Sequence, residues 1–236
     1  MPTLFYGEHQ IPYTLKPSRR RRTLALQVNP MQQVTVLAPQ RLSGTSIDRF
    51  LRERAEWVIK KLRYFEALGR QYPPKSYASG ETFLIRGQPH ILEVLVDPSY
   101  RRAQMERREG ALAVRVCAQE KVPLVVRRWY QAEAAVLIQE AVGRLSPALG
   151  VFPKRIRIAN QKRRWGSCSS RGDLRFNWRL AMMPGPIADY VVAHELAHMK
   201  VHNHSAEFWS TVRSILPDYV SRRAWLRANS VQFAVT

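Results

Sequence analysis

Apolar and polar residues alternate between residues 3 and 38, a pattern typical of strands with one buried face. LFYGEHQIPYTL predicts two short strands around a turn, and RTLALQVNP followed by QQVTVLAP predicts a hairpin that turns at Asn29–Pro30. From residue 46 to about residue 68, apolar side chains recur at helical spacing, which predicts an amphipathic helix capped by Thr45 or Ser46. The chain therefore opens with a β-rich part that ends in a helix.

A connection rich in proline and glycine follows at residues 69–80, and its start marks the expected domain boundary. We expect an N-terminal β-rich part over residues 1–75 and a second domain over residues 76–236. The second domain is expected to hold strands in ETFLIRG, HILEVLVD, ALAVRVCA and KRIRIANQ, a helix over about 123–145, a hairpin within 163–180 that turns at Ser170–Asp173, and helices over about 186–202, 205–216 and 218–229. No internal repeat is evident, and the predicted fold class is α+β with a helical C-terminal part.

The charge of the chain is strongly basic, with 38 Lys and Arg against 18 Asp and Glu and a formal net charge of +20. Guanidinium groups suit phosphates and carboxylates, so the excess indicates a polyanionic partner such as a nucleotide, a nucleic acid or an acidic peptide. The arginines are scattered rather than gathered in one basic arm. An arginine-rich coding bias spread over a solvated surface is therefore the alternative interpretation.

Three absences indicate the cellular setting. The two cysteines are too few for a disulfide framework. The sequence contains no run of 18 or more apolar residues, so no membrane span is predicted. The N-terminus lacks the basic and apolar regions of a secretory signal. We therefore expect a cytoplasmic protein without a membrane partner.

Four of the six histidines lie in the stretch DYVVAHELAHMKVHNHSAEFW at residues 189–209. An α-helix turns by about 100° per residue, so His194 and His198 lie on one face, as two imidazole ligands of one zinc must. Glu195 is rotated away from that face by one residue. In this position it can act as a general base beside the metal without being a ligand. The helix is otherwise apolar, and buried polar side chains on it would need partners such as a metal.

A catalytic zinc usually has three protein ligands, so a third is needed. His202 would share the face if the helix continued, and Glu207 could reach back from the next helix. His204 can approach only if the helix ends first and the chain turns back. Asn203 tolerates the left-handed conformation that ends helices, and Ser205 can cap the helix that follows. Geometry alone favours His204 over His202 and leaves both open.

The sequence resembles the YgjP-like metallopeptidase family of the zincin group. RRWGSCSSRGDLRFNWRL, then a proline, then DYVVAHELAHMKVHNHSAEFW is similar to that family's signature in order and spacing, over residues 163–209. The resemblance implies a zincin-like catalytic part with a small mixed sheet, Glu195 as the catalytic glutamate, and zinc ligands at His194, His198 and His204. Metzincins share this histidine spacing, but Val201 stands where they have glycine.

The motif WGSCSSRGDLRFNW precedes the histidine helix. Gly166 permits a close approach of another group to the backbone, and Gly172 suits a tight turn. Zincin sites commonly carry a strand that pairs with an extended substrate, so we expect residues 173–180 to run beside the metal cleft. Three arginines are candidates to hold an anionic substrate or a developing oxyanion: Arg164, Arg175 and Arg179.

The leading functional prediction is a zinc-dependent metallopeptidase. Zinc would activate a water molecule, and Glu195 would take its proton and pass it to the leaving group. The resemblance also implies an alternative, because a nucleotide pyrophosphatase activity on UTP is ascribed to some members of the family and would suit the arginine excess. A second alternative is a nucleic-acid-associated protein with a zincin site, which would bind DNA in a salt-sensitive way.

Overall fold

The alternating residues at the start of the chain form a four-stranded sheet in the computed structural model, which describes residues 1–29, 31–161 and 164–234. Its strands are β1 (Thr3–Tyr6), β2 (His9–Ser18), β3 (Ala25–Val28) and β4 (Val34–Pro39), in the order β1-β2-β4-β3. Both expected hairpins are confirmed, because β1 pairs antiparallel with β2 and β3 with β4, whereas β2 and β4 are parallel. The turn predicted at Asn29–Pro30 includes Pro30, which lies outside the described residues.

The single helix predicted over residues 46–68 is two helices, α1 (Gly44–Arg52) and α2 (Ala55–Gln71). The predicted caps Thr45 and Ser46 are wrong, because the Ser43 hydroxyl caps α1 by accepting the Ser46 N–H at 3.3 Å. Arg54, at φ −118° and ψ 8°, leaves the helical conformation and separates the two helices. Apolar residues of both helices share one cluster with the sheet: Leu4, Ile11, Val34, Val36, Ala38, Ile47, Leu51, Ala55 and Val58.

A second four-stranded sheet repeats the topology of the first. Its strands are β5 (Thr82–Ile85), β6 (Gln88–Val96), β7 (Gln104–Arg108) and β8 (Ala111–Val116), in the order β5-β6-β8-β7. The outer pairs are antiparallel and the central pair, β6 and β8, is parallel. The two sheets thus share a topology that no repeat in the sequence indicates.

A long helix, α3 (Val122–Leu149), follows a short 3₁₀ turn, η1 (Gln119–Lys121). The helix runs past its expected end at about residue 145 and includes Pro147 in its last turn. The helix ends where Gly150 adopts φ 62°, a left-handed conformation that glycine takes without steric cost. Buried side chains occur along the whole of α3, which packs against α4, β8 and β9 and forms the centre of the larger hydrophobic cluster.

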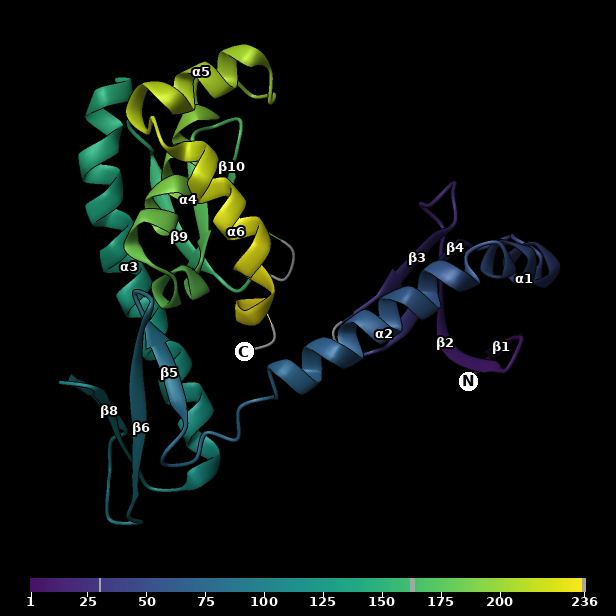
Figure 1. The fold of residues 1–236 in the computed structure, drawn as a ribbon, viewed down its shortest axis with the longest axis horizontal. Helices are drawn as coiled ribbons and strands as arrows, with labels where there is room; N and C mark the ends of the chain where they lie inside the picture. Colours follow the sequence, from purple (N-terminus) through teal and green to yellow (C-terminus); the bar gives the residue numbers. More distant parts are fainter. Residues whose placement is uncertain (30, 162–163, 235–236) are drawn as a thin grey trace. The chain divides into compact units, whose positions relative to one another are not determined.

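The C-terminal region has a small mixed sheet and three helices (Figure 1). The sheet has the order β10-β11-β9, so β11 is central, antiparallel to β10 and parallel to β9. Figure 1 shows α4 between α3 and α6, and α4 contacts both. The elements are β9 (Arg155–Ala159), β10 (Gly166–Cys168), β11 (Asp173–Asn177), a 3₁₀ turn η2 (Trp178–Met182), α4 (Gly185–Ala197), α5 (Ala206–Ile215) and α6 (Tyr219–Ala234).

The described chain divides into two compact units, Met1–Pro74 and Lys75–Ala234. The α+β class is confirmed, with a β-rich first region followed by helices and small mixed sheets. That residues 1–75 and 76–236 are separate domains stays a prediction. Within the described ranges, none of the helices combines the length and the apolar composition needed to cross a bilayer.

Candidate metal centre

Helix α4 carries the two histidines of the HELAH motif into the core of the second unit. Its body is buried on all sides, because it packs against α3 and α6. His194 lies in its last turn and His198 is its C-cap, so the two rings lie one turn apart with their centroids separated by 4.8 Å. The helical spacing thus presents both imidazoles to the same place.

The chain turns back directly after α4, earlier than the helix predicted to residue 202. The N–H groups of Met199, Lys200 and Val201 bond back to carbonyls of α4, so the helix tightens and stops. Asn203 then accepts the N–H of Ser205 at 3.1 Å, and α5 begins at Ala206.

This turn returns His204 to the end of α4. Potential ligand atoms of His194, His198 and His204 all lie within 4.8 Å of one another. Within the described part of the chain this is the group of side chains that could hold a metal, and neither His202 nor Glu207 belongs to it.

The contacts of the imidazoles leave ring nitrogen atoms available close to one another. The Nδ1 of His198 lies 3.1 Å from the carbonyl oxygen of Val201, which can only accept, so the ring proton is on Nδ1 and Nε2 is free to bind a metal. The Nε2 atoms of His194 and His204 face each other at 3.1 Å. Three imidazoles arranged in this way fit a zinc ion with an open fourth position.

Burial favours the neutral form of His194 and His198. It lowers the pKa of His194 to about 3, with further lowering by His198, His204 and Arg223. The pKa of His198 is also lowered, again mainly by burial. A metal competes with protons for imidazole nitrogen, so histidines that are already neutral suit ligation.

Phe208 on α5 packs against all three imidazoles. Its side chain is fully buried, and its ring centroid lies 4.9, 4.5 and 4.8 Å from those of His194, His198 and His204. An aromatic ring in this position restricts the rotamers of the three histidines. Phe208 therefore helps to hold the nitrogen atoms in place.

Glu195 lies beside the histidine cluster without belonging to it. Its side chain is 6% exposed and packs on Gly166 of β10. Burial raises the pKa of its carboxyl group to about 7, while the charge of Arg164 and a backbone hydrogen bond from Cys168 lower it. The carboxylate is thus desolvated and held by the backbone of the WGSCS motif.

We expect Gly166→Ala to displace the Glu195 carboxylate. A Cβ at residue 166 would lie 2.6 Å from both Cγ and Oε1 of Glu195, which is closer than real contacts allow. Activity should fall at least about tenfold, because a small misplacement of a catalytic group has such a cost, and the metal content should not change. Gly143→Ala is the matched control, since a Cβ there meets nothing within 4 Å. Equal kcat values in the two variants would contradict this expectation.

The three arginines expected near the substrate lie in different places. Arg164 is exposed, and its charge acts on Glu195. Arg175 pairs with Ser167, which follows Gly166 in β10. Successive side chains of a strand point to opposite faces, so Arg175 lies on the sheet face away from Glu195, which packs on Gly166. Arg179 lines a pocket that contains none of the three histidines. We retain only Arg164 as a candidate at the metal centre.

The expectation that residues 173–180 run beside the metal cleft stays a prediction, but β11 is not the strand open to a substrate. Residues 174–176 are paired with β10 on one edge and with β9 on the other, and Trp178–Met182 is a 3₁₀ turn. The two edge strands of the sheet are β10 and β9, and β10 contacts α4. The edge backbone that contacts α4 is therefore that of Gly166–Cys168.

Two further groups near the histidines were missed in the sequence. Tyr190 lies four residues before His194 on the same helix face, and its ring centroid is 6.1 Å from that imidazole. Helical spacing could have identified it. Arg223 on α6 stacks on Trp209 at 4.4 Å and its charge lowers the pKa of His194. No local pattern links Arg223 to the motif, because α6 reaches the site only through tertiary packing.

The match to a protein-family model agrees with the motifs. A family model described as "YgjP-like, metallopeptidase domain" matches residues 22–229, which confirms the resemblance seen in the sequence. The chain is also similar to a solved structure, "Crystal structure of the metallopeptidase zymogen of Pyrococcus abyssi abylysin", at 21% identity and a TM-score of 0.35. That match covers 41% of this chain and 95% of the other. The comparison with curated proteins gives no match.

Proposed function

Because the chain belongs to the YgjP-like metallopeptidase family, we propose that it is a zinc-dependent metallopeptidase with Glu195 as its general base. The zinc ligands in this proposal are His194, His198 and His204. One observation carries it: three imidazoles offer nitrogen atoms within 4.8 Å of one another, beside a buried carboxylate that is not part of their cluster. That combination is the minimum for metal-assisted hydrolysis.

Zinc, when bound there, supplies a Lewis acid that polarises the scissile group and lowers the pKa of water. Glu195 accepts the proton of the attacking water and returns it to the leaving nitrogen. The backbone at Gly166 and Cys168 keeps the Glu195 carboxylate in place during both transfers. Phe208 fixes the imidazole rings, so little reorganisation accompanies the reaction.

The proposed substrate is an extended peptide that pairs with β10. This strand is at the edge of its sheet, so one side of it is not paired with another described strand. Main-chain hydrogen bonds to such an edge hold a peptide largely independently of its sequence. A peptide added there would pass directly beside Glu195, which packs on Gly166 of the same strand.

A second candidate, a nucleoside triphosphate pyrophosphatase that uses the same histidines, is favoured by two basic side chains. The charge of Arg164 acts on Glu195 and that of Arg223 acts on His194. Guanidinium groups on two sides of a hydrolytic centre could hold phosphates.

Association with nucleic acid stays a prediction, as does the cytoplasmic location, which the two free cysteines support.

A parallel activity screen separates the two candidates. Zinc-loaded protein is incubated with unstructured peptides and, separately, with nucleoside triphosphates including UTP. We expect new peptide termini by mass spectrometry and no release of pyrophosphate or phosphate. Pyrophosphate release without peptide cleavage would replace the peptidase proposal with the second candidate.

A further inference from the structure

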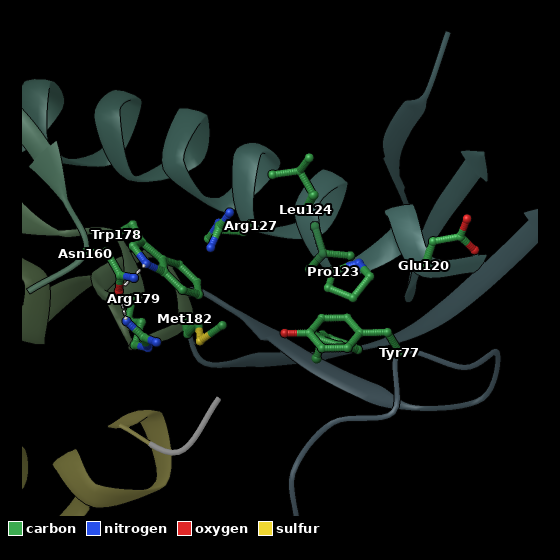
Figure 2. A pocket seen from close by; sticks show the side chains of 11 residues that line it. Tyr77, Glu120, Pro123, Leu124, Arg127, Asn160, Trp178, Arg179 and Met182 are labelled. Atoms are coloured by element: carbon green, nitrogen blue, oxygen red, sulfur yellow. Dashed lines mark hydrogen bonds between the residues drawn. The ribbon is translucent and has the colours of Figure 1, made fainter. Parts of the chain in front are cut away.

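A pocket lies in the unit Lys75–Ala234, and its lining does not include the histidine cluster (Figure 2). Its volume is about 310 Å³, which is at the small end of the range for ligand sites. It lies between the first turns of α3 and the 3₁₀ turn η2, and none of the three histidines or Glu195 lines it. Its lining includes the side chains of Tyr77, Phe83, Arg127, Trp178, Arg179 and Met182.

Two guanidinium groups reach this pocket from different elements. Arg179 is held in a fixed orientation, because its Nη1 donates to the Oδ1 of Asn160 at 2.8 Å and its guanidinium stacks on Trp178 at 4.3 Å. Burial lowers the pKa of Arg179, and the charge of Arg127 lowers it further. The two cations therefore repel each other, at a cost that a bound anion would relieve.

The acidic side chains around the pocket do not neutralise Arg127. Among the described residues, none of the ion pairs involves Arg127. Glu120 also lines the pocket, but Figure 2 shows it at the end away from Arg179. Arg127 also lies near the start of α3, a 28-residue helix whose positive end adds to the attraction for an anion.

Tyr77 is held in the pocket by a strained backbone. Its φ of 58° is in the left-handed region, which is unfavourable for an aromatic residue and often accompanies a functional constraint. The Glu81 carboxylate accepts the Tyr77 N–H at 2.6 Å, and Gln119 donates to the Tyr77 carbonyl at 2.9 Å. Figure 2 shows the Tyr77 hydroxyl directed into the pocket, towards the end lined by Met182.

We propose that this pocket binds a small organic anion, a carboxylate or phosphate group carried on a flat ring. The anionic group would accept hydrogen bonds from Arg127, Arg179 and the hydroxyl of Tyr77. Each guanidinium offers several N–H donors in one plane, and the tyrosine offers one O–H donor. The ring would lie among the apolar side chains of the lining, which include Phe83 and Met182. This site is separate from the proposed metallopeptidase chemistry and needs no metal.

Isothermal titration with two simple probes tests the proposal. Benzoate and phenyl phosphate carry the two possible anionic groups, and benzyl alcohol is the neutral control. At least one anion should bind at one site per chain, and benzyl alcohol should not. Arg127→Gln should weaken the binding at least about tenfold, the cost of a lost charge-assisted hydrogen bond. Arg128→Gln is the matched control, because this neighbouring exposed arginine does not line the pocket.

The outcomes separate this site from the metal centre, which could also bind anions. Titration of the His204→Ala variant should give the same affinity as wild type, whether or not that variant holds zinc. Binding by phenyl phosphate alone or by benzoate alone would support the proposal and identify the anionic group. The proposal is overturned if neither anion binds, if benzyl alcohol binds equally well, or if the two arginine variants weaken binding alike. Binding that survives Arg127→Gln but disappears in His204→Ala would also overturn it.

Discussion

Glu195→Gln should lower kcat by about 10²–10⁴-fold, the usual contribution of general acid–base catalysis, while the zinc content stays unchanged. The amide is nearly the same size as the carboxylate, so it should fit against Gly166, but it cannot accept a proton from water. The unchanged zinc content follows because Glu195 is not part of the group that could hold a metal. Elemental analysis and steady-state kinetics on the same preparation measure both effects.

Glu207→Gln is the matched control for this substitution. Glu207 is an exposed carboxylate in the first turn of α5, close to the site in sequence but outside the histidine group. Its loss should change kcat by less than about threefold, since exposed side chains away from the reacting atoms contribute little. Full activity in Glu195→Gln would remove Glu195 as the general base, whatever happens in the control.

His204→Ala should release zinc, whereas His202→Ala should keep it. Loss of a residue that only hydrogen-bonds to a metal ligand weakens metal binding by about 10–100-fold. Loss of a direct ligand such as His204 should weaken zinc binding by more than that. His202 is the natural control, since it lies two residues away, is equally exposed and does not belong to the group. Competition with a chelator of known zinc affinity gives both dissociation constants.

The two histidine variants also test the turn that follows α4. If His202→Ala loses zinc and His204→Ala does not, the third ligand has been assigned to the wrong histidine. Circular dichroism and thermal unfolding of both variants should show intact folding in the presence of zinc. This check matters because His204 also packs on Phe208, and its removal leaves part of that buried ring without contacts.

The parts of the site that depend on helix geometry could be predicted from the sequence. The spacing of His194 and His198 places them on one face of any helix, and Glu195 must then lie off that face. The amphipathic and alternating patterns likewise predicted the α+β class and both hairpins of the first sheet. These features follow from the fixed periods of helices and strands, which act over a few residues.

Other features depend on contacts between segments that are far apart in the sequence. Strand β11 is the central strand because β9 pairs with it from the other side, so the edge strand that contacts α4 is β10. Arg223 reaches the metal centre from α6, and Arg179 lies in a pocket with Tyr77, which is about a hundred residues earlier in the chain.

The motifs by themselves thus determined the family, two histidines on one helix face and a glutamate beside them. The tertiary structure decided what surrounds them. It ended α4 at Ala197, so that His204 rather than His202 lies with the pair. It also set Glu195 on Gly166. Local periods follow from backbone geometry, whereas strand neighbours, helix ends and buried contacts depend on how distant segments pack to remove apolar surface from water.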